Sequence, residues 1–419
     1  MPSLTSSKYR FAFIMVTSLF FLWGFVHNMN PILIPHLKRS FTLNVTQSTL
    51  IDSAVYIAYF LMALPAGFIM KKFGYKTGII AGLLFFATGT FLFIPAANTQ
   101  SYDFFLLALF IIACGLTMLE TAANPYASSL GDPETSTQRL NFSQSFNGLA
   151  AALAPVIGAR VILTRSYSDT ELNTMTDAAR KIALASEASS VKTPYLIFGL
   201  LLVLVSVIFI FTKLPVIQND DDQAAGKNIF HAFRHRHLSW AVVTQFFYVG
   251  GQVCILSLFV LYASKSAGIS EIKASNYSGV CGAAFLAGRF LGTFLMKYIK
   301  PQRLLALYAA INILLCIAAI EAHGMITVYA VIAICFFMSI MFPTIFALGI
   351  KELKGDTEFG SSLLIMSIVG GAILPRIFGL ISDGTGNIQY GYIVPLVCFT
   401  VILFFAWKGY KVVGKKNVE

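Results

Sequence analysis

The sequence predicts an all-helical membrane protein with twelve spanning helices. Of its 419 residues 57% are hydrophobic and 12% are charged, whereas soluble domains have about 45–50% apolar and about 25% charged residues. Long apolar runs such as residues 197–211 can lie in hydrocarbon only as helix, because their backbone polar groups must be satisfied internally. With about 20 residues per span, the apolar content suffices for about twelve helices. This composition excludes a secreted disulfide scaffold, a disordered chain and an ordinary cytosolic enzyme.

The spans follow one another with mostly short connections. We expect them at residues 11–36, 48–70, 77–96, 103–130, 141–163, 193–213, 239–263, 275–297, 303–322, 325–350, 359–382 and 390–408. The first ten residues contain no cleavage motif, so the first run is expected to remain as a helix and not to act as a removed signal peptide. One long connection, at 164–192, is rich in Ser, Thr, Asp and Ala.

The second long connection divides the helices into two sets of six. Residues 1–213 and 239–419 are therefore each predicted to form a six-helix bundle, joined by a cytoplasmic linker at 214–238. The two halves repeat each other at an offset near 220 residues. The matching pairs are Gly148 and Gly370, Pro155 and Pro375, and Gly158 and Gly379. Parallel repeats related by a pseudo-twofold axis place a binding site between the halves, near the midplane of the membrane.

The net charge of +11 is distributed by side of the membrane. With the N-terminus inside, nineteen of the 30 Lys and Arg residues lie in the cytoplasm and eight outside, as the positive-inside rule requires. Both termini are thus expected in the cytoplasm. The charge needs no nucleic-acid partner to explain it.

Cysteine and histidine spacing indicates no metal site. The six cysteines all fall in apolar runs without a CxxC pair, so we interpret them as packing residues. His231, His235 and His237 are interpreted as part of a solvated basic loop. No cofactor is expected.

Only two acidic residues, Glu120 and Asp52, fall clearly within spans. A carboxylate in the bilayer is costly and marks function by default, so Glu120 is predicted to bind and release a proton during transport. The alternative for Glu120 is a structural pair with an amide of the fifth helix or with an arginine. Asp52 is either a second coupling site, a sodium ligand or an interfacial helix cap. His27 is either a proton partner or a packing histidine.

Amides and a phenol at helical spacing form the candidate substrate site. Such groups both donate and accept hydrogen bonds, which suits an uncharged, polyhydroxylated ligand. The candidates are Asn28, Asn30, Glu120, Asn124, Gln144, Asn147, Gln245, Tyr248 and Gln252. The alternative for each is hydrogen bonding between helices. Arg289 and Arg376 are interpreted as structural counter-charges to helix ends and carboxylates.

Several segments together resemble the fucose/galactose/glucose proton symporter family of the major facilitator superfamily. They are residues 119–125 (LETAANP), 139–141 (RLN), 338–339 (MS), 343–346 (PTIF), 349–351 (GIK), 382–383 (SD) and 386–388 (GNI). The resemblance implies the twelve-helix major facilitator fold and uptake of a neutral hexose such as fucose, galactose or glucose with a proton, by alternating access. It also implies that Glu120 contacts sugar and handles the proton, and that Gln144 and Asn147 line the cavity.

One position departs from the fucose-type pattern. The aspartate of the first helix in that pattern falls at Pro31 here, so Asp52 or His27 can take over its role, or the coupling ion can be sodium. A multidrug or lipid exporter is a further alternative, and the rows of amides count against it. An intramembrane enzyme would need a nucleophile and base or a metal-ligand set, and the sequence shows neither. We expect a monomer that is surrounded by lipid, in an inner (plasma) membrane.

Overall fold

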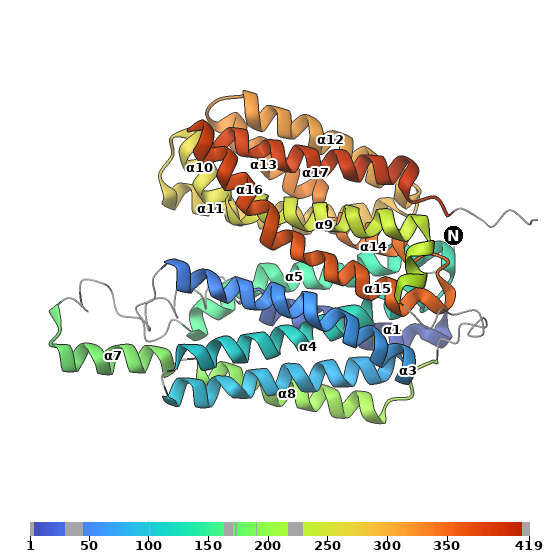
Figure 1. Ribbon diagram of the computed structural model, residues 1–419, viewed down its shortest axis with the longest axis horizontal. Helices are drawn as coiled ribbons and strands as arrows, with labels where there is room; N and C mark the ends of the chain where they lie inside the picture. The colour runs from blue at the N-terminus through green and yellow to red at the C-terminus, as the bar shows by residue number, and fades with distance from the viewer. Residues whose placement is uncertain are drawn as a thin grey trace, which may run out of the picture. The chain divides into compact units, whose positions relative to one another are not determined.

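The computed structural model describes residues 4–29, 45–99, 101–162, 171, 174–189, 191–216 and 229–412. Throughout these ranges the chain consists of helices joined by short connections, without strands (Figure 1). The chain divides into two compact units. Unit 1 comprises Met1–Phe20, Asn124–Gly148 and Pro215–Glu419, and unit 2 comprises Phe21–Ala123 and Leu149–Leu214. The division into two six-helix bundles at the 214–238 linker stays a prediction.

In the described part of its first half, the chain supplies six helices longer than one turn. They are α1 (Arg10–His27), α3 (Val45–Thr99), α4 (Tyr102–Ser129), α5 (Ser136–Ile162), α7 (Asp177–Ser189) and α8 (Lys192–Phe211). Two predicted spans run together in α3 and are separated by Gly74, whose φ of 81° and ψ of 166° break the helix in the connection between the predicted spans 48–70 and 77–96. The helix α7 lies inside the connection 164–192, where apolar content predicts no span.

Within residues 229–412 the second half contains nine α-helices, and three of the predicted spans there are divided between two helices each. They are α9 (Arg236–Ser257), α10 (Phe259–Ala267), α11 (Glu271–Leu295), α12 (Pro301–Glu321), α13 (Met325–Met338), α14 (Met341–Gly349), α15 (Thr357–Met366), α16 (Gly370–Thr385) and α17 (Ile393–Phe404). The run 239–263 breaks at Leu258, between α9 and α10. The run 325–350 breaks at Ser339 and Ile340, between α13 and α14. A one-turn 3-10 helix, Ser367–Val369, separates α15 from α16.

The described helices account for all twelve predicted spans. Ten segments are long and apolar enough to cross a membrane, and one of them, Ser53–Thr99, has 47 residues and holds two predicted spans. The more polar α5 supplies the remaining span. Large apolar side chains lie exposed along these helices, as on α8, where Leu200, Leu204 and Phe211 are 57%, 56% and 82% exposed. A surface of this kind fits contact with lipid.

Close packing in each unit rests on small residues and long helix contacts. In unit 2, α3 packs along α8, and a Cβ added at Gly115 of α4 would lie 2.8 Å from the carbonyl oxygen of Gly82 in α3. Glycine at such a crossing lets two helix backbones approach each other. In unit 1, α9 packs against α14, α16 and α17, and α13 packs against α11 and α12.

Candidate functional site

The carboxyl group of Glu120 has a phenol as its partner. The hydroxyl of Tyr59 in α3 donates a 2.7 Å hydrogen bond to Oε1 of Glu120 in α4. Tyr59 is 3% exposed and Glu120 is half-buried, so the pair lies inside unit 2 and within two apolar helices. The predicted structural partners were an amide of the fifth helix or an arginine. The observed partner is neither of these.

Two of the predicted amides are brought together in unit 1. Nε2 of Gln144 in α5 donates a 3.1 Å hydrogen bond to Oδ1 of Asn124 in α4, and both side chains are buried. The amide nitrogen of Asn124 is buried without a hydrogen-bond partner among the described residues. Asn147, one turn beyond Gln144, is half-buried. The contact leaves donor capacity at Asn124 for a further group.

The three candidate substrate-site residues on α9 lie in different environments. Gln245 is completely buried, and neither its amide oxygen nor its amide nitrogen has a hydrogen-bond partner within the described part of the chain. Tyr248 donates a 3.2 Å hydrogen bond to the carbonyl of Met338, the last residue of α13. Gln252 is half-buried. Tyr248 thus makes a contact between helices, and Gln245 keeps its full capacity to donate and accept.

Arg289 of α11 binds backbone carbonyls. Its Nε donates to the carbonyl of Ser339 at 2.9 Å, and its Nη1 donates to the carbonyl of Gln144 at 2.8 Å. The guanidinium also lies 4.5 Å from the ring centroid of Phe285. Ser339 caps the C-terminus of α13, so the predicted counter-charge to a helix end is confirmed for Arg289. The carbonyl contact on α5 was not predicted. Arg376 is exposed on α16.

Three buried hydrogen bonds connect the first half of α5 to α11 and α14, all of them in unit 1. One is the bond from Arg289 to Gln144. The second runs from Nε2 of Gln138 to the carbonyl of Thr293, at 3.0 Å. In the third, Nδ2 of Asn141 donates to Oγ1 of Thr344 at 3.1 Å. These bonds join a helix of the first sequence repeat to two helices of the second.

Arg139 holds the turn between α4 and α5. Its side chain is completely buried, and it donates to the carbonyl of Asp132 at 2.8 Å and to Oγ1 of Thr135 at 2.6 Å. It also donates to the carbonyls of Ser128 and Leu4. The planar guanidinium, with five N–H donors, can satisfy several carbonyls at a helix end at once.

The candidates of the first helix and of α3 are described only in part. His27 is exposed at the end of α1, and Asn28 donates a 2.7 Å hydrogen bond from its side chain to the carbonyl of Gly24. Asn30 lies outside the described residues, and Asp52 lies in α3 with its side chain outside them. Their predicted roles stay predictions.

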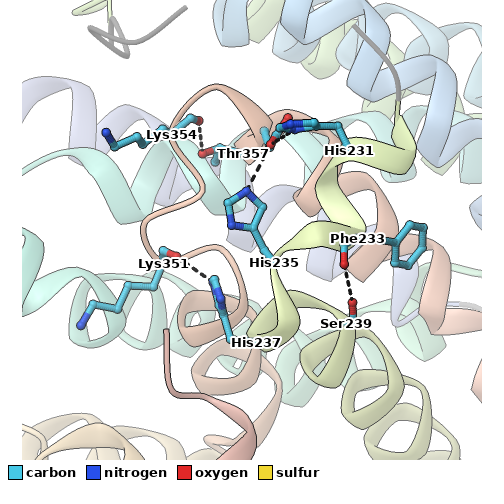
Figure 2. A network of polar contacts seen from close by, with 9 residues as sticks. His231, Phe233, His235, His237, Ser239, Lys351, Lys354 and Thr357 are labelled. Carbon is cyan, nitrogen blue, oxygen red and sulfur yellow. Dashed lines mark hydrogen bonds and ion pairs between the residues drawn. The ribbon is translucent and has the colours of Figure 1, made fainter. Parts of the chain in front are cut away.

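The histidines at the start of the second half do not form the solvated loop that the sequence predicts. His231 Nδ1 and His235 Nε2 lie 2.8 Å and 3.2 Å from the same oxygen, Oδ2 of Asp356. Figure 2 shows these two histidines and His237 beside the segment that carries Lys351, Lys354 and Thr357. His237 is 1% exposed and lies 2.8 Å from the carbonyl oxygen of Lys351 through its Nε2. The interpretation as a solvated loop is therefore wrong for this segment, which packs onto the loop between α14 and α15. Within the described part of the chain, no group of three or more His, Cys, Asp or Glu residues could hold a metal ion.

The cysteines behave as packing residues. All six are free and buried, as their position in apolar runs predicts. Five of them lie in helices α9, α11, α12, α13 and α17 of unit 1.

The apolar helices account for twelve spans, and several of these spans are interrupted. Two of the helices hold a carboxyl–phenol pair between them. Together these features define a multi-pass membrane transporter. The chain belongs to the Major Facilitator Superfamily, whose sequence profile matches residues 12–357. It is 41% identical over 409 residues to the L-fucose-proton symporter of Escherichia coli, covering 96% of this chain and 93% of that one. It is also 41% identical over 411 residues to the glucose/galactose transporter of Brucella abortus, with 97% and 96% of the two chains covered.

The fold has a solved counterpart at useful sequence identity. A crystal structure of the major facilitator transporter FucP in the outward conformation matches with a TM-score of 0.89 and 40% identity, over 96% of this chain and 99% of that one. The predicted fold class and the predicted resemblance are both confirmed. The relatives are transporters, so the alternative of an intramembrane enzyme is not supported.

Proposed function

We propose that this protein imports a neutral hexose together with a proton, by alternating access. The support comes from relatives that cover nearly the whole chain and are named as an L-fucose-proton symporter and a glucose/galactose transporter. The amides and phenols in the spans add chemical support, because they can donate to and accept from sugar hydroxyls. An exporter of apolar compounds would have little use for them.

The observation that carries the proposal is the hydrogen bond between Tyr59 and Glu120. A carboxyl group placed inside the membrane is expensive unless it is protonated or paired. Tyr59 supplies a donor to the carboxylate, and it can stay in place when Glu120 takes up a proton on its other oxygen. Glu120 is thus suited to hold and release a proton during each transport cycle.

The sugar is proposed to bind through the predicted substrate-site residues. The residues are Asn28, Asn30, Glu120, Asn124, Gln144, Asn147, Gln245, Tyr248 and Gln252. A buried amide without a partner carries a desolvation cost that a ligand hydroxyl can remove. Gln245 and the amide nitrogen of Asn124 are in this condition, which makes them the best supported of the set.

The three hydrogen bonds from α5 to α11 and α14 are proposed to close the cytoplasmic end of the pathway. Each joins a residue of the first repeat to a residue of the second. Access from the cytoplasm requires the two repeats to part at that end, so these bonds would break in the opposite state. Individually weak bonds of this kind allow both states to be populated.

Sodium coupling is the second candidate, and one observation favours it. Pro31 stands where the fucose-type pattern has the aspartate of its first helix. Asp52 and His27 are the proposed additional coupling residues, and a carboxylate such as Asp52 is also a suitable sodium ligand. A comparison of sugar uptake into vesicles with a pH gradient alone and with a sodium gradient alone separates the candidates. Uptake that follows sodium and ignores pH would exclude the proton.

We place the protein in the inner (plasma) membrane as a monomer, with both termini in the cytoplasm and with residues 1–213 and 239–419 as the two moving halves. This orientation rests on the excess of Lys and Arg on one side of the spans. No cofactor is needed for ion-coupled sugar movement.

The direct test is Glu120→Gln in proteoliposomes. The variant should lose accumulation of sugar against its gradient while keeping exchange of sugar across the membrane, because glutamine keeps the hydrogen-bonding shape but cannot release a proton. Glu271→Gln, an exposed acid in the first turn of α11, is the matched control and should transport normally. Unchanged uphill accumulation in Glu120→Gln would reject the proposed role. A panel of hexoses in a thermal-shift assay then identifies the sugar.

A further inference from the structure

A cavity of about 830 Å³ opens beside the contact between α5 and α11, and none of the proposed sugar-binding residues lines it. Its lining comes from Leu4, from the turn before α5, from α5 itself, from the end of α11 and the start of α12, and from Lys351. All of these residues belong to unit 1. The cavity is large enough for a phosphate-bearing headgroup together with its glycerol.

The charges of the cavity favour an anion. Lys297, Lys300 and Lys351 line it, and Glu134 is the single acidic residue among the described residues of its lining. All three lysines are exposed, so their ammonium groups are free to turn toward a ligand. Lys351 also lies 3.8 Å from the exposed carboxylate of Glu352, and an ion pair of that kind is too weak to prevent binding. The three lysines outnumber the glutamate, so the cavity can bind one phosphate group without acquiring a net negative charge.

The apolar edge of the cavity points to a lipid. Phe290, Phe294 and Tyr298, all in its lining, are 42%, 49% and 62% exposed. Phe290 and Phe294 lie in the last turns of α11, and Tyr298 lies just beyond its end at Leu295. The helix α11 is one of the candidate membrane spans. Lys297 lies 5.3 Å from the ring centroid of Phe294. Lysines directly after an apolar span, beside exposed aromatic rings, lie at the depth of lipid headgroups.

One part of the lining belongs to the contact between α5 of the first repeat and α11 of the second. Gln138 and Thr293 line it, and their 3.0 Å hydrogen bond joins α5 to α11. A ligand in this position would touch both helices. Its binding would therefore stabilise the conformation in which α5 and α11 are in contact.

We propose that this cavity binds an anionic phospholipid of the cytoplasmic leaflet, with its phosphate held by Lys297, Lys300 and Lys351 and its acyl chains along Phe290 and Phe294. The leaflet assignment rests on the proposed orientation, in which these lysines are cytoplasmic. Binding of lipid itself needs neither sugar nor an ion gradient. Its test can therefore fail or succeed independently of the proposed transport function.

The experiment uses the full chain in nanodiscs of phosphatidylcholine alone and in nanodiscs with equal parts of phosphatidylcholine and phosphatidylglycerol. Thermal unfolding and native mass spectrometry report stabilisation and retained phosphatidylglycerol. The test variant changes Lys297, Lys300 and Lys351 to Gln. The control changes three exposed cytoplasmic lysines outside the cavity, Lys213, Lys408 and Lys411, to Gln. A third variant changes the three cavity lysines to Arg.

The unaltered protein, the control and the arginine variant should be stabilised by phosphatidylglycerol and should retain it. The glutamine variant of the cavity should lose both effects, with retention weaker by about fivefold for each lysine removed. Equal retention by that variant would overturn the proposal, and so would an equal loss in the control, which would indicate general surface charge. If sodium phosphate or glycerol phosphate stabilises the protein in phosphatidylcholine alone as strongly as the lipid does, the ligand is a soluble anion and the lipid assignment is wrong. Should the triple variant fail to fold, Lys300→Gln alone must show the fivefold loss.

Discussion

Tyr59 and Glu120 connect α3 and α4 through a single hydrogen bond of 2.7 Å inside one compact unit. The phenol is almost completely buried, so water cannot easily replace it as the donor. A carboxylate that loses such a donor keeps its desolvation cost without compensation. The pair therefore links the protonation state of Glu120 to the packing of two helices.

Tyr59→Phe removes the donor and keeps the ring. We expect coupled sugar accumulation to fall by about tenfold, which corresponds to about 1.4 kcal/mol and to one lost hydrogen bond to a carboxylate. Tyr308→Phe is the control, because this equally buried tyrosine contacts the ring of Phe337 in another part of the fold. Initial rates of uptake under a pH gradient check the prediction. Equal rates in both variants would show that the bond has no part in coupling.

A comparison of Thr344→Val with Thr293→Val distinguishes the contribution of a hydrogen bond between helices from that of a hydrogen bond within one helix. Both hydroxyls donate to a carbonyl four residues earlier, of Ile340 and Arg289 respectively. Only the hydroxyl of Thr344 also accepts from Asn141 of α5. Thr344→Val should therefore lower the free energy of unfolding by about 0.5–1.5 kcal/mol more than Thr293→Val. Thermal unfolding of both purified variants measures the difference, and equal midpoints would contradict it.

Arg139→Lys tests whether the buried guanidinium is replaceable by another cation. Arg139 serves the carbonyls of Ser128 and Asp132 and the hydroxyl of Thr135 at once, and a lysine ammonium cannot reach them in that geometry. Because buried carbonyls would be left unsatisfied, we expect a loss of about 2–4 kcal/mol. Arg303→Lys, at the exposed start of α12, should be neutral. Yield of folded protein and its thermal midpoint report the outcome.

Hydropathy was sufficient to predict the spans, because hydrocarbon allows a long apolar run only one backbone conformation. It could not predict where a span is interrupted. The breaks at Leu258 and at Ser339 lie within apolar runs and depend on which side chains and carbonyls of neighbouring helices receive the freed groups. The helix α7 was missed because its residues are mostly polar or small.

The sequence identifies candidate site residues by type, and their roles stay predictions. Glu120, Asn124 and Gln144 are conspicuous because polar groups in apolar helices are rare. The sequence does not identify Tyr59 as the partner of Glu120. Which residues pair between two helices depends on the rotation and the depth of each helix in the membrane. The spacing of residues within one helix gives no information on either quantity.

Asp356→Asn tests the histidine–aspartate cluster in Figure 2. The side chain of Asp356 is only 4% exposed and faces both His231 and His235, so its Oδ2 oxygen relies on these two contacts for hydrogen bonds. Asparagine fills the same space, but its neutral amide oxygen accepts hydrogen bonds from two imidazoles more weakly than a carboxylate oxygen does. We expect a loss of about 1–3 kcal/mol in the free energy of unfolding. Asp383→Asn, an exposed acid near the end of α16, is the control and should change stability little. Thermal unfolding at neutral pH compares the two, and equal stability would show the cluster to be dispensable.

The glycines Gly370 and Gly379 occupy the same helix, α16, in opposite surroundings. A Cβ at Gly370 would collide with the backbone carbonyl of Phe246 in α9, whereas a Cβ at Gly379 would meet nothing within 4 Å. Gly370→Ala should therefore force α16 away from α9, at a cost of about 1–3 kcal/mol. Gly379→Ala should stabilise the helix by as much as about 1 kcal/mol, because alanine loses less backbone entropy than glycine on folding.

The repeat partner of Gly370 is Gly148, where a Cβ would lie 3.3 Å from the end of the Leu286 side chain. A side chain can move where a backbone cannot, so Gly148→Ala should cost less than Gly370→Ala. Thermal midpoints in the order Gly379→Ala, Gly148→Ala, Gly370→Ala, from highest to lowest, would confirm that backbone contact is what requires glycine at position 370.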